Sequence, residues 1–250
     1  MKKHIPNLIT MGNLICGCIG IGYAVHDQIA LTGIFLMSGI FLDFFDGLAA
    51  RWLNVSSELG TQLDSLADGV TSGVLPAMVM YQMLVDATGH EVFGEHLHWS
   101  GSTVDNLFWF VPLIAFAIAA ASMYRLAVFN LDTRQTTSFI GLPTPANALF
   151  IVSLGYLAQH TKWDALANAL DSVWVLLGLI VFSCWVLNSE IRLFAFKFKH
   201  FGWKGNEIRW LFAAGTLVAL VLLQVAAVPI IILSYILISI FTSKKAVATA

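Results

Sequence analysis

The chain has 250 residues, of which 58% are hydrophobic and only 11% are charged, and its formal net charge is −2. An ordinary soluble domain is about 25% charged, so this composition excludes a soluble globular protein. We expect an all-α fold, a polytopic membrane helix bundle, and no nucleic-acid partner.

Eight apolar stretches follow one another along the chain. A membrane span needs roughly 17–25 mostly apolar residues, and the stretches approach or meet that length. We predict spans at residues 7–25, 29–53, 57–82, 106–129, 143–160, 171–190, 210–226 and 228–242. The last two form one apolar stretch interrupted by Gln224 and Pro229, so a single long helix and a tight hairpin are both open.

The basic residues favour the hairpin and indicate an orientation. If the N-terminus is cytoplasmic and all eight spans cross, 12 of the 13 Lys and Arg residues lie inside and only Lys162 lies outside. The positive-inside rule predicts this asymmetry, whereas one long final helix would place Lys244 and Lys245 outside. We therefore expect an inner-membrane protein whose two termini face the cytoplasm.

Three regions follow from this threading: a core at residues 1–190, a segment at 191–209 and a C-terminal transmembrane hairpin at 210–243. The segment 191–209 alternates basic and aromatic residues. Such a pattern is typical of an amphipathic stretch on the anionic inner leaflet, and we expect membrane lipids as its partners. A plain positive-inside loop is the alternative.

Four carboxylates interrupt the apolar pattern of spans two and three. Asp43 and Asp46 are three residues apart, and Asp64 and Asp68 are four apart, so each pair lies on one helix face. The turn between the spans faces the cytoplasm in this threading, and the two pairs therefore meet at similar depth below that surface. A carboxylate at bilayer depth costs about 2.5–3.5 kcal/mol, so the four acids need partners or a function.

Divalent cations would relieve the repulsion among converging carboxylates. Oxygen ligands without nearby His or Cys suit Mg²⁺, Mn²⁺ or Ca²⁺ rather than Zn²⁺, and two such ions can clamp a phosphate or pyrophosphate. The neighbouring glycines and Arg51 favour a phosphate ligand. Pairing of the acids with side chains of different spans stays open, and so does the cation pathway of a divalent metal transporter.

The carboxylates belong to a longer pattern, D-x2-D-G-x2-A-R-x8-G-x3-D-x3-D, which is met in full between Asp43 and Asp68. This pattern resembles the signature of the CDP-alcohol phosphatidyltransferases. The resemblance implies a six-helix catalytic core, within residues 1–190 here, that forms a homodimer. It further implies transfer of a phosphatidyl group from a CDP-linked lipid to an alcohol, with release of CMP.

The resemblance also implies roles for individual residues. Two divalent cations, Mg²⁺ or Mn²⁺ with Ca²⁺ as a substitute in a crystal, would be bound by Asp43, Asp46, Asp64 and Asp68. Asp68 would also be the general base on the acceptor hydroxyl. The residues that we expect along the CDP-lipid are Asn7, Thr10, Gly47, Ala50, Arg51 and Gly60.

Three further features resemble the bacterial and archaeal members of the family that use serine. They are PNLIT at 6–10 followed by Gly12–Asn13, YRLAVFN at 124–130, and FIGLPTPANA at 139–148. The resemblance implies CDP-diacylglycerol as the donor and L-serine as the acceptor. The residues that we expect to bind serine are Arg125, Asn130, Phe139, Gly141 and Pro143.

Serine carries a carboxylate, which needs a cation near the metal site. Arg125 lies at the cytoplasmic end of span four, and we expect it to hold this carboxylate while the Phe139–Pro145 loop closes over it. An ordinary positive-inside anchor is the alternative role for Arg125. Glycerol 3-phosphate, inositol and inositol phosphate stay open as acceptors, although the few cations of the inner face favour an unphosphorylated alcohol.

Overall fold

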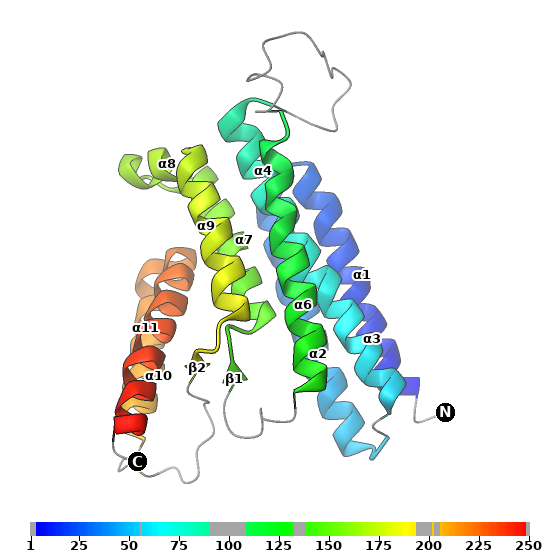
Figure 1. Ribbon diagram of the computed structural model, residues 1–250. Helices are drawn as coiled ribbons and strands as arrows, with labels where there is room; N and C mark the ends of the chain where they lie inside the picture. The colour runs from blue at the N-terminus through cyan, green and yellow to red at the C-terminus, as the bar shows by residue number, and fades with distance from the viewer. Residues whose placement is uncertain are drawn as a thin grey trace.

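The computed structural model describes residues 4–55, 57–90, 109–132, 139–193, 202 and 206–248. Its helices run mostly along one direction and form a bundle (Figure 1). The prediction of an all-α, multi-pass membrane bundle is confirmed.

The first two helices, α1 (Ile5–Val25) and α2 (Ile29–Trp52), form an antiparallel hairpin. Asp27 makes the tight turn between them with a φ of 58°, a left-handed conformation that Asp adopts more readily than most residues. The buried face of α1 consists largely of small or polar residues such as Thr10, Asn13 and Gly17. This face lets the following helix approach α1 closely.

The third span is one continuous 31-residue helical stretch from Glu58 to Thr88. It consists of α3 (Glu58–Asp68), the π-helix η2 (Gly69–Val74) and α4 (Leu75–Thr88). The Ser57 hydroxyl caps α3 by accepting a hydrogen bond from the Gly60 N–H at 3.1 Å. In α4 the side chains of Leu75, Met80 and Leu84 are fully buried, so this helix lies at the centre of the core.

Within the described residues, the second half of the core contains the helices α6 to α9. The 3₁₀ turn η3 (Val111–Phe116) leads into α6 (Ala117–Leu131), and α7 (Thr144–His160) follows. The short helix α8 (Asp164–Leu170) then bends by 72° into α9 (Val173–Asn188). Figure 1 shows α8 across the end of the bundle that is opposite to the α2–α3 turn.

A two-residue antiparallel pairing, which the sequence analysis did not predict, joins β1 (Phe139–Ile140) to β2 (Arg192–Leu193). It connects the chain before α7 to the chain after α9, and both strands lie at the end of the bundle that holds the α2–α3 turn (Figure 1). Most of the predicted segment 191–209, including residues 194–201 and 203–205, lies outside the described part of the chain.

The last two helices, α10 (Glu207–Leu223) and α11 (Ala227–Ala248), lie side by side (Figure 1). Gln224 breaks the helix with a φ of 51°, and the turn η4 (Gln224–Ala226) reverses the chain. The rings of Phe212 and Tyr235, which lie at similar distances from the turn, are 5.9 Å apart between centroids. The chain therefore folds back here, as the hairpin alternative predicts.

Within the described residues, five stretches have the length and composition to cross a membrane, and six if the bent α8–α9 pair is one span. Residues 209–242 are a single stretch in this count, so eight crossings stay a prediction. Large apolar side chains face outward on several helices; Leu8, Phe41 and Leu222 are examples. Such a surface suits a hydrocarbon environment and not water.

Candidate functional site

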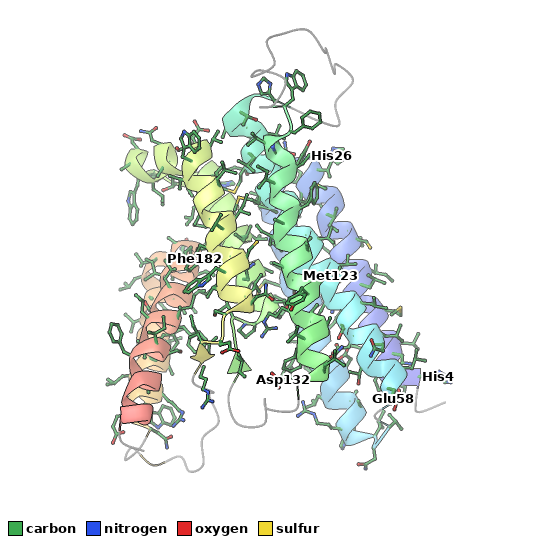
Figure 2. All side chains as sticks on the ribbon, in the orientation of Figure 1. His4, His26, Glu58, Met123, Asp132 and Phe182 are labelled. Carbon is green, nitrogen blue, oxygen red and sulfur yellow. The ribbon has the colours of Figure 1, made fainter. Side chains whose placement is uncertain are left out.

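Three of the four predicted carboxylates converge where α2 meets α3. Asp43 lies near the end of α2, and Asp64 and Asp68 lie on α3. One carboxylate oxygen from each of these three residues lies within 4.8 Å of the other two. Asp64 and Asp68 belong to the helix that begins at Glu58, which Figure 2 labels near one end of the bundle.

The fourth carboxylate, Asp46, is held by α1. Its Oδ2 accepts a hydrogen bond of 2.5 Å from the Thr10 hydroxyl, and its side chain is only 5% exposed. Asp46 is not in the group of three mutually close carboxylates. Thr10 thus has a structural contact with the site in addition to its predicted role at the CDP-lipid.

Asp68 also has a partner on α1. The Asn13 side-chain N–H donates to Asp68 Oδ1 at 3.1 Å, and the Asn13 side chain is fully buried. The Thr71 hydroxyl in turn donates to the Asn13 backbone carbonyl at 3.1 Å. Asn13 was not predicted as a site residue and entered only as part of a motif, although its spacing of three from Thr10 places both residues on the same helix face.

The helix changes from α to π geometry directly after Asp68. Isolated π turns are frequent at functional sites because they shift the phase of the side chains that follow. The turn packs closely against α1, since a Cβ at Gly17 would overlap Thr71. It also packs against α6, where Gly69 lies against Met123 and Gly73 lies against Ser122. The helix contact at Gly69 and Gly73 is therefore close, with α6 as the partner helix.

The donor set fits a hard divalent cation. Three carboxylates that are this close repel one another unless a positive charge compensates them. Asp64 Oδ1 is buried and has no hydrogen-bond partner among the described residues. Carboxylate oxygens are the ligands that Mg²⁺, Mn²⁺ and Ca²⁺ prefer. The arrangement can therefore hold a metal ion, although it does not by itself select one.

A cavity of about 190 Å³ lies beside the carboxylates, between α1, α2 and α3. Five of the six residues predicted along the CDP-lipid line it, and these are Asn7, Thr10, Gly47, Ala50 and Gly60. Asp46 and Asp64 line it as well. Three further lining residues, Val55, Ser57 and Thr61, were not predicted from the sequence, and Pro6 entered only as part of the PNLIT motif.

The sixth predicted residue, Arg51, does not line this cavity. Its side chain is exposed, and its Nε donates to the Gly47 backbone carbonyl at 3.0 Å, one helical turn earlier. The contact leaves the guanidinium near the cavity wall, because a Cβ at Gly47 would lie 3.9 Å from the Arg51 Nη2.

The predicted serine-binding residues of α6 separate in space. Arg125 is 8% exposed, its guanidinium carbon lies 6.0 Å from the Phe129 ring centroid, and it interacts electrostatically with Asp68. Asn130 instead donates from its side chain to the Ser65 hydroxyl at 2.8 Å. Asn130 therefore ties the end of α6 to α3, the helix that carries Asp64 and Asp68.

The predicted Phe139–Pro145 loop is anchored to the chain around the end of α9. Gly141 has a φ of 73°, and its N–H donates to the Ile191 carbonyl at 3.0 Å. Pro143 directly precedes α7, and the Phe139 side chain lies outside what the structure describes. The loop residue that shares a cavity with Arg125 is Ile140, which the sequence analysis did not select.

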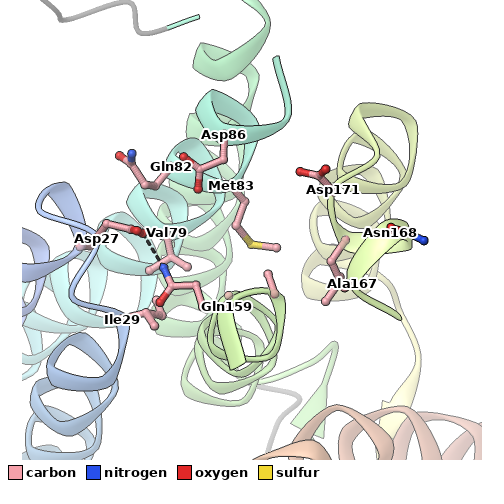
Figure 3. Close-up of a pocket in the computed structure, with 14 residues that line it drawn as sticks. Asp27, Ile29, Val79, Gln82, Met83, Asp86, Gln159, Ala167, Asn168 and Asp171 are labelled. Carbon is pink, nitrogen blue, oxygen red and sulfur yellow. Dashed lines mark hydrogen bonds between the residues drawn. The ribbon is translucent and has the colours of Figure 1, made fainter. Parts of the chain in front are cut away.

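A larger cavity of about 270 Å³, drawn in Figure 3, is lined in part by residues of α8, at the end of the bundle opposite to the α2–α3 turn (Figure 1). Asp27, Asp86 and Asp171 line it with exposed side chains, and the Gln159 amide donates to Asp27 Oδ1 at 2.5 Å. The continuous helix between Asp68 and Asp86 carries no carboxylate, and its middle part is buried among apolar side chains. This arrangement gives no support to a line of acids through the membrane.

Comparisons with known proteins agree with the pattern of the site. A model of the CDP-alcohol phosphatidyltransferase family matches residues 3–197. A CDP-diacylglycerol–serine O-phosphatidyltransferase of Bacillus subtilis (strain 168) is 35% identical over 154 residues, which are 62% of this chain and 76% of that protein. The enzyme of the same name from Helicobacter pylori (strain J99) is 31% identical over 194 residues, 77% of this chain and 72% of that protein. The enzyme of the same name from Methanocaldococcus jannaschii is 28% identical over 179 residues, 72% of this chain and 71% of that protein.

Proposed function

Because the chain belongs to the CDP-alcohol phosphatidyltransferase family, we propose that it transfers a phosphatidyl group from CDP-diacylglycerol to the hydroxyl of L-serine and releases CMP. The observation that carries the proposal is the convergence of Asp43, Asp64 and Asp68 beside a cavity lined by residues of the family pattern. The relatives named as serine enzymes support serine as the acceptor.

In this proposal the CDP moiety occupies the cavity between α1, α2 and α3, where Gly47 and Gly60 leave room for it. Asp43, Asp46, Asp64 and Asp68 hold two divalent cations, Mg²⁺ or Mn²⁺, which when bound stabilise negative charge on the phosphate oxygens. Thr10 and Asn13 orient Asp46 and Asp68 through their hydrogen bonds. The carboxylates thereby keep one arrangement while the substrate binds.

Asp68 is the general base of the proposed reaction and takes the proton of the serine hydroxyl. The serine oxygen forms a bond to the phosphorus that carries the lipid, and the bond from that phosphorus to the oxygen of CMP breaks. The reaction is a direct displacement, because it needs no nucleophilic Ser or Cys. Arg125 binds the serine carboxylate, a role that its burial and its interaction with Asp68 support.

We further propose that the enzyme is a homodimer in the inner membrane, with its site and both termini on the cytoplasmic side. Glycerol 3-phosphate, inositol and inositol phosphate are the alternative acceptors. A phosphorylated alcohol would need several cations near the carboxylates, and the sequence offers chiefly Arg51, Arg125 and Arg134 near the motif, of which Arg134 lies outside the described residues. This small number favours serine.

The test is an assay of CMP release by the purified protein in detergent with CDP-diacylglycerol and Mn²⁺. Serine, glycerol 3-phosphate, inositol and inositol phosphate are supplied in parallel, and we expect release with serine alone. Release with a different alcohol would reject the acceptor and keep the reaction class. No release with any of them, from folded protein, would reject the proposed function.

The metal requirement is a separate prediction. We expect that chelation with EDTA abolishes CMP release and that Mg²⁺ or Mn²⁺ restores it, because bound divalent cations would offset the repulsion between the converging carboxylates and the phosphates. Activity that persists after exhaustive chelation, with metal content measured by atomic spectroscopy, would contradict the prediction.

A further inference from the structure

A second small cavity, of about 150 Å³, is lined by Arg125 and shares no lining residue with the CDP-lipid cavity. It is formed by α6, by β1 and by the residues that end α9. Its polar lining residues include Arg125, Asp132, Asn188, Ser189 and Glu190. Pockets for drug-sized ligands measure roughly 300–1,000 Å³, so this cavity suits only a very small polar molecule.

One wall of the cavity offers a buried cation. Arg125 is only 8% exposed, and its Nε is buried without a hydrogen-bond partner among the described residues. A buried charge is costly unless an opposite charge or hydrogen bonds compensate it. The guanidinium is always protonated and presents a planar set of donors that matches a carboxylate. The wall at Arg125 is therefore suited to an anionic group of a ligand.

The wall formed by the end of α9 offers hydrogen-bond acceptors. The Asn188 Nδ2 donates to the carbonyls of Ala121 and Cys184, each at 3.2 Å, so the group that Asn188 can offer a ligand is its oxygen. The Ser189 hydroxyl donates to the Val186 carbonyl at 3.1 Å, which leaves its oxygen lone pairs for a ligand. Glu190 adds an exposed carboxylate.

The position of this wall strengthens its preference for a cation. Asn188 is the last residue of α9, a helix of 16 residues, and Ser189 and Glu190 follow it directly. The carbonyl end of a helix carries a partial negative charge, which favours a positive group within the last turn. The cavity thus combines a cationic wall with an acceptor wall that attracts a cation.

We propose that this cavity binds the acceptor as an α-amino acid zwitterion, with its carboxylate on Arg125 and its ammonium on Glu190, assisted by the oxygens of Asn188 and Ser189. The inference rests on the proposed function and adds the group that recognises the amino end. Glu190 is then the residue that distinguishes an amino acid from other small alcohols. Arg125 links this cavity to the carboxylate cluster, because it also interacts electrostatically with Asp68.

The test compares the wild type with Glu190→Gln, Glu190→Lys and the control Asp164→Asn. Asp164 is an exposed carboxylate in the first turn of α8, at the opposite end of the bundle. We expect Glu190→Gln to raise the KM for serine about tenfold, which is the effect of losing one charge-assisted hydrogen bond. Glu190→Lys should raise it further, while the KM for CDP-diacylglycerol and the serine kinetics of Asp164→Asn stay as in the wild type.

A binding measurement separates this inference from the proposed function. Serine, 3-hydroxypropionate and ethanolamine are titrated against the thermal unfolding midpoint of the detergent-purified wild type and of Glu190→Gln. We expect serine alone to stabilise the wild type, and Glu190→Gln to need about tenfold more serine for the same shift. Serine binding that depends on Glu190 in a protein without serine-dependent CMP release would reject the function and support the inference.

Two outcomes would overturn the inference. One is an unchanged KM for serine and an unchanged titration in both Glu190 variants of an active protein. The other is equal stabilisation of the wild type by 3-hydroxypropionate, which has the carboxylate and hydroxyl of serine and lacks the ammonium.

Discussion

Asp68 is the residue on which most of the proposed chemistry depends. It shares the carboxylate cluster with Asp43 and Asp64, and it also accepts a hydrogen bond from Asn13. Its neighbour Asp46 receives the corresponding hydrogen bond from Thr10. Two polar residues of α1, one turn apart, therefore hold one carboxylate of each acidic helix. The orientation of the acids depends on this pairing as well as on their own spacing.

The change Asp68→Asn tests the role of Asp68. The amide keeps the shape of the side chain and can still accept the hydrogen bond from Asn13 through its oxygen, but it cannot take a proton. General base catalysis contributes about 10²–10⁴-fold to a rate, so we expect CMP release to fall by at least that factor while CDP-lipid binding is partly retained. CMP release and binding of labelled CDP-diacylglycerol are measured on the same preparation.

The matched control for this change is Asp171→Asn, an exposed aspartate at the opposite end of the bundle. Asp171→Asn should leave both CMP release and the binding of CDP-diacylglycerol as in the wild type. If Asp68→Asn loses CDP-lipid binding together with turnover, Asp68 serves only to hold metal and the general base is another group.

At the scale of the elements, two devices position the site. The π turn directly after Asp68 brings this helix against α1 and α6 through glycine contacts. The β1–β2 pairing and the hydrogen bonds of Gly141 and Leu142 join the loop before α7 to residues 186–193. This second device places Ile140 in the cavity that also contains Arg125 and Glu190.

The change Gly141→Ala tests the second device. Gly141 has a φ of 73°, and a Cβ there would overlap the Leu187 carbonyl. A left-handed conformation costs a non-glycine residue roughly 1–2 kcal/mol, and the overlap adds to this cost. We expect a lower thermal unfolding midpoint in detergent and a higher KM for serine, because the loop moves away from the end of α9.

Gly178→Ala is the comparison for this change. Gly178 lies inside α9, and a Cβ there would meet no atom within 4 Å. Alanine is the better helix former by about 1 kcal/mol, so this variant should unfold no earlier than the wild type. An unchanged midpoint and an unchanged serine KM in Gly141→Ala would show that the loop conformation does not matter for the site.

At the scale of the whole molecule, the beginning of α1, the α2–α3 turn and the end of α11 all lie at one end of the bundle (Figure 1). The carboxylate cluster is near the same end. The distribution of Lys and Arg predicts that this end faces the cytoplasm. A site at that depth can receive a lipid from the inner leaflet and a water-soluble acceptor from the cytoplasm.

Cysteine labelling tests this orientation in a background that lacks the three native cysteines. His26 and Glu58 are exposed and lie at opposite ends of the bundle (Figure 2). We expect His26→Cys to react with a membrane-impermeant maleimide in intact spheroplasts, and Glu58→Cys to react only after permeabilisation. Labelling of Glu58→Cys and protection of His26→Cys in intact spheroplasts would reverse the orientation.

The sequence by itself determined the class of fold and the residues of the acidic motif. The length of an apolar stretch identifies a membrane helix, because the thickness of the bilayer sets the length that a span needs. The spacing within Asp43–Asp46 and within Asp64–Asp68 places each pair on one helix face. The alternation of small and polar residues on α1 could have revealed Asn13 as well. These features depend on the length and period of a single helix, and the sequence of that one segment is enough to show them.

Only the tertiary structure decided which polar groups of different helices meet. It grouped Asp43, Asp64 and Asp68 within 4.8 Å and bonded Asp46 to Thr10. It also directed Asn130 to Ser65 and brought Ile140 and Glu190 into one cavity with Arg125. Such contacts join residues far apart in the chain, and they depend on helix packing and on a two-residue strand pairing that has no periodic signal. Side chains that complete a site from several elements are therefore set by packing, which a single sequence does not display.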